Sequence, residues 1–230
     1  MSGSRHTARY TTKAGSDEFD ARLTSPVFER NCQPMIAALS PLFEGRSGPV
    51  LEIGAGTGQH AAAFAAAFPS LQWWASDLAE SHRASIAAWA THSQSPVRGP
   101  LNLDAESDWA VSADVAALGP LTGVLAMNVI HIAPIEVAEG IIRGAAKALS
   151  EGGLLLFYGP FTEHGQHITE SNAAFDRGLR SDDPAWGVRD VQELAACAAP
   201  VGLRYEALIE MPANNRVLLF CRIEARTLRA

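Results

Sequence analysis

Three glycines at alternate positions, Gly54, Gly56 and Gly58, follow an apolar run that contains one carboxylate, Glu52. Glycine lets the backbone approach a ligand closely and adopts the positive φ angles of tight turns. The spacing is one residue tighter than the dinucleotide fingerprint G-x-G-x-x-G, and Gln59 stands where a third glycine is expected. A carboxylate here is unfavourable beside a pyrophosphate and favourable beside a cationic ligand. We therefore expect a nucleotide-like ligand that carries positive charge.

Polar residues also follow the next three apolar runs. Asp77 stands 19 residues after Gly58 (77 − 58), about the distance at which an acid reaches a ribose diol in such units. Asp104 and Asn128 end the third and fourth runs. Each feature alone is weak evidence, because a single aspartate at a strand end is more often a helix cap. Together they indicate one site at the carboxyl edge of a sheet.

These groups match S-adenosyl-L-methionine, which presents an ammonium, a sulfonium and a ribose diol. Glu52 suits the positive charge and Asp77 the diol. In class I S-adenosylmethionine-dependent methyltransferases, which this series of motifs resembles, the position of Asp104 commonly meets the adenine edge, and that of Asn128 lies near the methionine part. We expect this cofactor, with S-adenosyl-L-homocysteine as product. The expected cofactor-binding residues are Glu52, Gly54, Ala55, Gly56, Thr57, Gly58, Asp77, Leu78, Asp104 and Asn128.

Two residues near the same strand ends are candidate catalytic groups. His131 stands three residues beyond Asn128, and Tyr158 ends the neighbouring apolar run. Either side chain could accept a proton from the methyl acceptor; the alternative for both is a structural hydrogen bond. Orientation of two reactants supplies about 7–11 kcal/mol, against ~3–5 kcal/mol for one general base. An acceptor that binds unprotonated therefore needs no base.

Short apolar runs alternate with helical patterns along the chain, which predicts an α/β fold with a mostly parallel sheet. The expected strands cover residues 50–54, 71–76, 97–103, 123–129 and 154–160. Helices are expected over residues 59–69 and 80–92, and from Pro134 to the Glu151-Gly152-Gly153 stop, with a Glu139–Arg143 ion pair.

The last part of the chain predicts a β-hairpin. Residues 203–211 alternate strictly, and residues 216–224 alternate again after a turn at PANN. We expect one side of the first strand to carry Leu203, Tyr205, Ala207, Ile209 and Met211. The predicted fold is thus a doubly wound, mostly parallel seven-stranded sheet with a C-terminal antiparallel hairpin. This plan resembles class I S-adenosylmethionine-dependent methyltransferases, whereas an ordinary dinucleotide-binding fold ends with a parallel strand.

Composition excludes several classes of function. The net charge is −7, from 18 Lys+Arg and 25 Asp+Glu, so we expect no nucleic-acid partner. No apolar run reaches the roughly 18 residues that span a bilayer, so we expect no membrane partner. The three cysteines lack paired spacing and predict reduced thiols in a cytoplasmic protein. His164 and His167 lack a third ligand at useful spacing, so no metal is expected.

Several stretches identify a more specific resemblance. They are SPVFERN (25–31), VLEIGAGTGQHAAAFA (50–65), SDLAESHRASIAAW (76–89), MNVIHIAP (127–134), GGLLLFYGPF (152–161), SNAAFDRGLR (171–180), PAWGVRD (184–190) and MPANN (211–215). With them the sequence resembles the methyltransferase-like twenty-six family, a domain of unknown function. The resemblance implies a class I fold and methyl transfer without naming a substrate. Cys32-Gln33 depart from the lysine and varied residue that commonly follow ERN in that family.

We expect one domain over residues 24–230, after a flexible tail over residues 1–23; a transit peptide is the weaker alternative for the first 16 residues. A lid helix is expected near residues 27–44 and an active-site insert near residues 159–190. In both regions a solvated surface is the alternative. The expected substrate-binding residues are Arg30, Asn31, Phe161, Asn172, Phe175, Arg180, Trp186 and Arg189.

The sequence therefore predicts a methyltransferase for a small molecule, active as a monomer or homodimer. Three alternatives stay open: a non-catalytic module that binds the cofactor, a protein methyltransferase, and, less favoured, a nicotinamide-dependent oxidoreductase.

Overall fold

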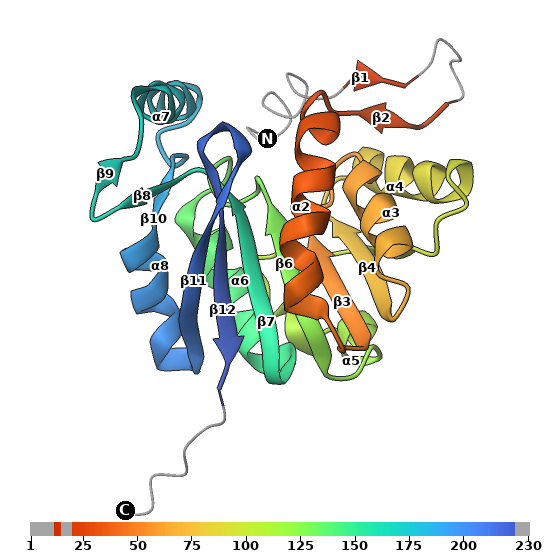
Figure 1. Cartoon of the computed structure of the whole chain (residues 1–230). Coiled ribbons are helices and arrows are strands. Elements are labelled where there is room, and N and C mark those ends of the chain that lie inside the picture. Colours follow the sequence, from red (N-terminus) through yellow and green to blue (C-terminus); the bar gives the residue numbers. More distant parts are fainter. Residues whose placement is uncertain (1–11, 15–19, 224–230) are drawn as a thin grey trace, which may run out of the picture.

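A seven-stranded sheet forms the centre of the protein in the computed structural model, which describes residues 12–14 and 20–223 (Figure 1). The strand order is β11-β12-β7-β6-β3-β4-β5, and β12 runs antiparallel to both of its neighbours. The strands are β3 (Gly48–Ile53), β4 (Leu71–Asp77), β5 (Arg98–Asn102), β6 (Leu121–Met127), β7 (Leu149–Gly159), β11 (Leu203–Met211) and β12 (Asn215–Arg222). The predicted fold, including the antiparallel hairpin, is confirmed.

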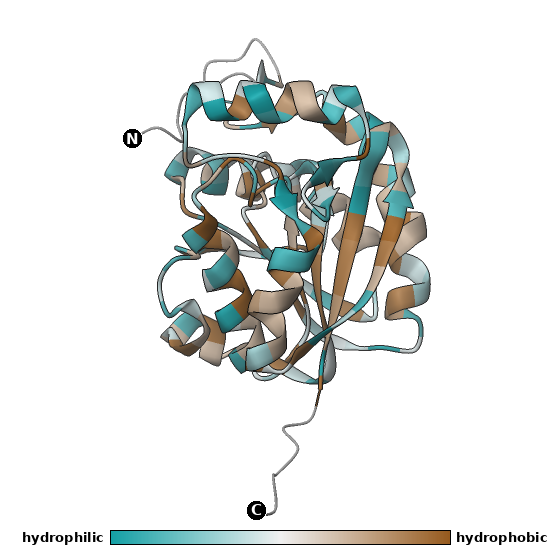
Figure 2. Cartoon of the chain, turned by 90° about the vertical axis from the view of Figure 1, so that its left-hand side faces the viewer, coloured by the Kyte–Doolittle hydropathy of each residue, from teal (hydrophilic) through white to brown (hydrophobic). Residues whose placement is uncertain are grey.

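Helices cover both faces of this sheet, and each face has its own apolar core. One layer consists of α2 (Val27–Phe43), α3 (Gln59–Ala67) and α4 (Glu80–His92); the other consists of α5 (Ala113–Ala116), α6 (Ile135–Ala148) and α8 (Val191–Ala198). Figure 2 shows hydrophobic residues along the middle of the strands and hydrophilic ones toward their upper ends. Three 3₁₀ turns, η1 (Trp109–Val111), η2 (Ala199–Val201) and η3 (Pro212–Asn214), complete the connections.

The end of helix α6 and the alternation of residues in β11 differ from the prediction. Helix α6 ends at Ala148 rather than at the glycines, because Leu149 already pairs with Leu121 and β7 begins there. In β11 a bulge between Tyr205 and Ala207 reverses the side on which residues lie. Leu203 consequently packs in the core beneath α6 and α8, whereas Ala207, Ile209 and Met211 pack in the core beneath α2 and α3. The prediction that these residues share one side is wrong.

The start of the described chain is held against helix α4. Strand β1 (Thr12–Lys13) pairs with β2 (Leu23–Thr24), and the Leu23 amide donates to Ser85 Oγ at 2.8 Å. The indole of Trp89 donates to the Leu23 carbonyl at 2.7 Å. Residues 12–14 and 20–23, which were expected to belong to a flexible tail, are therefore folded against the rest of the protein. The rest of that prediction lies outside the described residues.

The segment over residues 159–190 is folded rather than a long loop. It forms β8 (Phe161–Glu163), β9 (Gln166–His167), α7 (Glu170–Asp182) and β10 (Arg189–Asp190), with the strands in the order β10-β8-β9. Figure 1 shows α7 above this small sheet, at the carboxyl edge of the central one. Capping fixes the segment locally, because Thr169 Oγ1 accepts from the Asn172 amide and begins α7. Within the described part of the chain, no helix has the length and hydrophobicity needed to cross a membrane.

Candidate functional site

In the glycine turn between β3 and α3, neighbouring side chains and backbone crowd Gly54 and Gly58, whereas the space beside Gly56 is open. All three glycines have positive φ: +70° at Gly54, +57° at Gly56 and +84° at Gly58. A Cβ at Gly54 would lie 2.6 Å from Val129 Cγ2, and one at Gly58 would lie 2.6 Å from Ile86 Cα. At Gly56 no described atom lies within 4 Å of that position. The turn thus leaves free space at Gly56, where a ligand can approach the backbone.

Asp77 is tied directly to this turn. Its Oδ2 accepts from the Gly56 amide at 2.9 Å and lies 3.1 Å from His82 Nδ1. Its Oδ1 accepts from the Ala79 amide at 2.9 Å. Strand β4 ends here, so the carboxylate faces the turn from the neighbouring strand, as predicted. Gly56 and Asp77 form one polar wall of the open space.

Leu78 and Asp104 are the exposed members of the predicted cofactor set. Leu78 leaves 62% of its surface exposed, an unusual position for a large apolar side chain directly after a buried strand. The exposed Asp104 accepts from the Glu106 amide through Oδ1 at 3.0 Å and thereby caps a local turn. Their roles toward a cofactor stay predictions.

Glu52 is buried beneath the turn. Its side chain is 2% exposed, and its Oε2 accepts from Trp73 Nε1 at 2.8 Å. Burial raises the pKa of Glu52 to about 7, the Trp73 hydrogen bond opposes this shift, and the charge of Asp77 adds to it. The sequence pattern did not identify Trp73 as the partner, because its alternation in β4 only marked a buried residue. Glu52 is therefore an interior acid that titrates near neutral pH.

The end of β6 brings Asn128 and His131 close to the end of β7. Asn128 has a φ of +54°, and its amide donates to the Tyr158 carbonyl at 2.8 Å. His131 is 2% exposed, and its ring lies 6.0 Å from that of Phe175 in an edge-to-face contact. A Cβ at Gly159 would collide with the His131 ring, so this glycine is required there. Residues from β6, β7 and α7 thus meet at one place.

Tyr158 faces the layer of α2 and α3. Its hydroxyl accepts from Asn215 Nδ2 at 3.1 Å. Burial raises the pKa of Tyr158 to about 12, although the Asn215 hydrogen bond and the charge of Arg30 act in the opposite direction. A hydroxyl with this pKa keeps its proton at neutral pH, which argues against the proton-acceptor role predicted for it. The sequence analysis missed Asn215, since a residue in a polar turn carries no periodic signal.

Two predicted substrate-binding arginines are engaged within the protein. Arg189 donates to the carbonyls of Ile130, Ala133 and Ala185, at 2.9, 2.5 and 2.9 Å. Arg180 Nε donates to Asp176 Oδ2 at 3.1 Å. Asp176 Oδ1 in turn accepts from the Val188 amide at 2.7 Å, and its Oδ2 lies 3.4 Å from His167 Nε2. Arg189 therefore holds the loop that carries His131, and Asp176, which the sequence analysis missed, organises the insert.

Replacing Arg189 by methionine is expected to lower the free energy of unfolding by about 2–4 kcal/mol, because three carbonyls lose a charged donor. Urea denaturation measures this change. The matched control is R143M, since the exposed Arg143–Glu139 pair at 3.6 Å contributes no more than about 0.5 kcal/mol. Equal and small effects in both variants would contradict the positioning role of Arg189.

Four further residues predicted to bind substrate are buried. Phe161 and Trp186 are 1% and 3% exposed, and Phe161 packs in the core beneath α6 and α8. These two aromatic residues therefore have packing roles, and their predicted substrate contact is untested. Asn172 Nδ2 donates to the Asn214 carbonyl at 3.1 Å and ties α7 to the hairpin. Asn31 is 2% exposed and accepts from Arg30 Nε at 3.3 Å.

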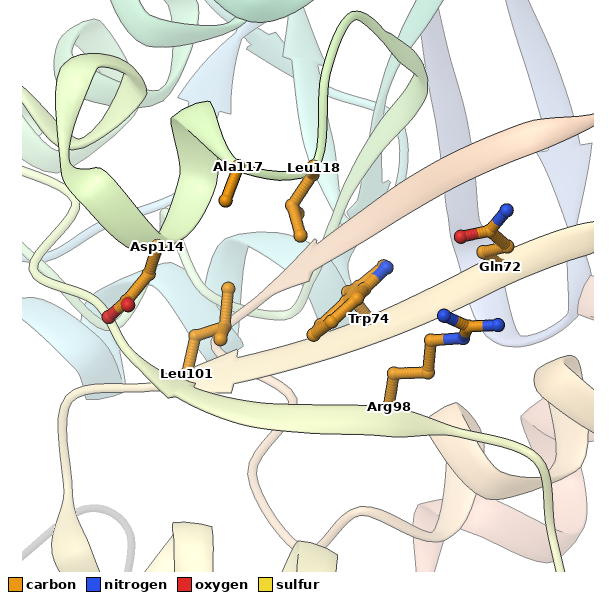
Figure 3. Close-up of a pocket in the computed structure, with 7 residues that line it drawn as sticks. All are labelled: Gln72, Trp74, Arg98, Leu101, Asp114, Ala117 and Leu118. Carbon is orange, nitrogen blue, oxygen red and sulfur yellow. The ribbon is translucent and has the colours of Figure 1, made fainter.

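Neither of two other features enlarges the site. The described residues contain no group of three or more His, Cys, Asp or Glu side chains placed to hold a metal ion. A depression of about 370 Å³ lies beside Trp74, with Arg98 and Asp114 on its walls (Figure 3). None of its lining residues was predicted for the site. The candidate functional site therefore remains the one predicted at the carboxyl edge.

Solved structures with similar folds include O-methyltransferases. An O-methyltransferase family protein from Burkholderia thailandensis is 17% identical, with a TM-score of 0.70 over 84% of this chain and 56% of its own. The mitomycin 7-O-methyltransferase MmcR is 20% identical, with a TM-score of 0.69 over 86% of this chain and 55% of its own. An O-methyltransferase from neocarzinostatin biosynthesis, solved with S-adenosylmethionine and 2-hydroxy-5-methyl naphthoic acid, is 18% identical, with a TM-score of 0.65 over 85% of this chain and 54% of its own.

The chain spans a little over half the length of these proteins, and at such identities the likeness shows the fold alone. A family model describes the chain itself: it matches residues 22–222, from β2 to the end of β12. The protein belongs to the DUF938 family of proteins of unknown function.

Proposed function

We propose that the protein is an S-adenosylmethionine-dependent methyltransferase that acts on a small molecule. The observation that carries this proposal is the glycine turn, open at Gly56 and joined there to the Asp77 carboxylate. The turn lies at the carboxyl edge of a sheet with the class I methyltransferase strand order. A dinucleotide-binding sheet would not place an antiparallel strand between β7 and β11.

The residues present fit this cofactor. Gly56 leaves room for the ligand beside the backbone, and Asp77 would hold the ribose hydroxyls. Leu78 would cover one face of the adenine, which accounts for its exposure, and Asp104 would lie at the adenine edge. Asn128, and Glu52 in its ionised form, would face the methionine part. Gly54, Ala55, Thr57 and Gly58 would shape the turn.

When bound, the cofactor supplies an activated methyl group: the S–CH₃ bond breaks with its electrons kept by sulfur, while an acceptor lone pair forms the new bond. The protein would mainly orient the acceptor and exclude water. His131, with Phe175 packed against its ring, would take a departing proton. Tyr158 would donate a hydrogen bond instead.

The comparisons support the proposed class of enzyme, a methyltransferase that uses S-adenosylmethionine, and not a particular substrate. The neocarzinostatin enzyme binds S-adenosylmethionine and a small aromatic acid, and a further neighbour, PigF, was solved with S-adenosylhomocysteine. The resemblance to the methyltransferase-like twenty-six family points the same way. We also propose a cytoplasmic protein with no nucleic-acid or membrane partner, active as a monomer or homodimer.

Isothermal titration tests the cofactor assignment. We expect one molecule of S-adenosylmethionine, or of S-adenosylhomocysteine, to bind per chain, with NAD(P)H binding weaker by more than about a hundredfold. Absence of S-adenosylmethionine binding to folded protein would overturn the proposal. Preferential NADH binding would favour the oxidoreductase alternative.

A further inference from the structure

We propose that the methyl acceptor carries a carboxylate, and that the guanidinium of Arg30 and the hydroxyl of Tyr158 bind it. This inference rests on the proposed methyltransferase function and names the class of its substrate. It concerns side chains from the first turns of α2 and from the end of β7.

Arg30 has most of its hydrogen-bonding capacity unused. It lies in the first turns of α2 and is exposed. Its Nε donates to Asn31 Oδ1 at 3.3 Å; within the described part of the chain, its two Nη groups have no hydrogen-bond or ion-pair partner. The buried Asn31 thereby orients a guanidinium whose free edge offers paired donors. Such an edge matches the two oxygens of a carboxylate.

Other described arginines differ in this respect. Their guanidinium groups contact carboxylates or backbone carbonyls of the protein, as Arg22 does with Asp20, Arg83 with Leu78, and Arg222 with Val201. Arg98, the other exception, lies over the Trp74 ring. The chain has a net charge of −7, so an anionic acceptor needs a local cation to hold it.

Tyr158 adds a buried donor to this place. Its side chain is 1% exposed, and its hydroxyl oxygen already accepts from Asn215 Nδ2. The hydroxyl proton is left to donate, and no acceptor for it lies among the described residues. Tyr158 packs in one core with Met35 and Leu39 of α2, the helix whose first turns carry Arg30. The charge of Arg30 also acts to lower the pKa of Tyr158. The guanidinium of Arg30 is thus a cationic hydrogen-bond donor and the hydroxyl of Tyr158 a neutral one, and one carboxylate would accept hydrogen bonds from both.

Radioactive methyl transfer tests this inference. A small-molecule cell extract is separated on an anion-exchange resin, and each fraction is incubated with methyl-labelled S-adenosylmethionine and the full chain. We expect label in the retained, anionic fraction. R30Q should reduce it about ten- to hundredfold at limiting extract by raising the apparent KM, with partial rescue in R30K, which keeps the charge without the fork.

The control is R143Q, an exposed arginine on α6, which should label as the wild-type protein does. All variants should bind S-adenosylmethionine equally, which separates acceptor binding from cofactor binding and from misfolding. Label mainly in the unretained fraction, or equal labelling by R30Q, would overturn the carboxylate inference and leave the methyltransferase proposal intact. No label in any fraction, from protein that binds the cofactor, would overturn both.

Discussion

Replacing Gly56 by leucine is expected to weaken S-adenosylmethionine binding at least about a hundredfold while the protein stays folded. The new side chain would enter the open space where the ligand is proposed to lie, because no described atom stands within 4 Å of a Cβ at this position. The positive φ of +57° adds a cost of about 1–2 kcal/mol to folding. Isothermal titration measures the binding and urea denaturation the stability.

Gly119 provides the matched control for this variant. It also has a positive φ, +76°, and no described atom lies within 4 Å of its Cβ position. It stands in the turn between α5 and β6, at the amino end of the sheet. G119L should therefore carry a similar backbone cost and bind the cofactor normally. If G56L bound as G119L does, the cofactor would not lie against the glycine turn.

The second large effect concerns Glu52 and pH. Its pKa rises from the ordinary 4.5 to about 7 on folding, so the folded protein binds this proton more tightly than the unfolded chain does. The stability from this site is present below pH 4.5 and is lost as the pH rises to about 7. The loss amounts to about 3 kcal/mol. E52Q should remove it, because glutamine has no such proton and keeps an oxygen that can accept from Trp73.

Urea denaturation of both proteins at pH 5 and pH 8.5 measures this difference. The wild-type protein should lose about 2.5 kcal/mol more than E52Q between the two values, and other titrating groups cancel in the comparison. Equal pH dependence in the two proteins would show that Glu52 is not a buried neutral acid. E52Q should also bind S-adenosylmethionine more weakly, since an acid kept at a cost in stability is expected at a functional site.

The parts of the fold that were predictable are those in which local pattern and tertiary packing agree. Apolar runs predicted strands such as β3 and β6, and the helical pattern over residues 59–69 predicted α3, which packs on the sheet. The Glu139–Arg143 pair forms as expected. The bulge at Tyr205 was not predictable, because strict alternation cannot show an extra residue that reverses the two faces.

The residues of the candidate site also divide into those that the sequence could predict and those that it could not. Spacing placed Gly56 beside Asp77, because both follow parallel strands that end at one edge. Spacing could not show that Arg189 and Arg180 bind groups of the protein through their guanidinium groups, whereas the two Nη groups of Arg30 have no partner among the described residues. Those outcomes depend on contacts between residues far apart in sequence, such as Asn215 with Tyr158.

Methyl transfer into a small-molecule extract and a protein extract, assayed side by side, separates the proposed function from its alternatives. With methyl-labelled S-adenosylmethionine, the wild-type protein and G119L should label a small molecule, and G56L should label none. Label confined to protein would instead indicate a protein methyltransferase. Cofactor binding with no label in either extract would contradict catalysis and leave a module that only binds S-adenosylmethionine.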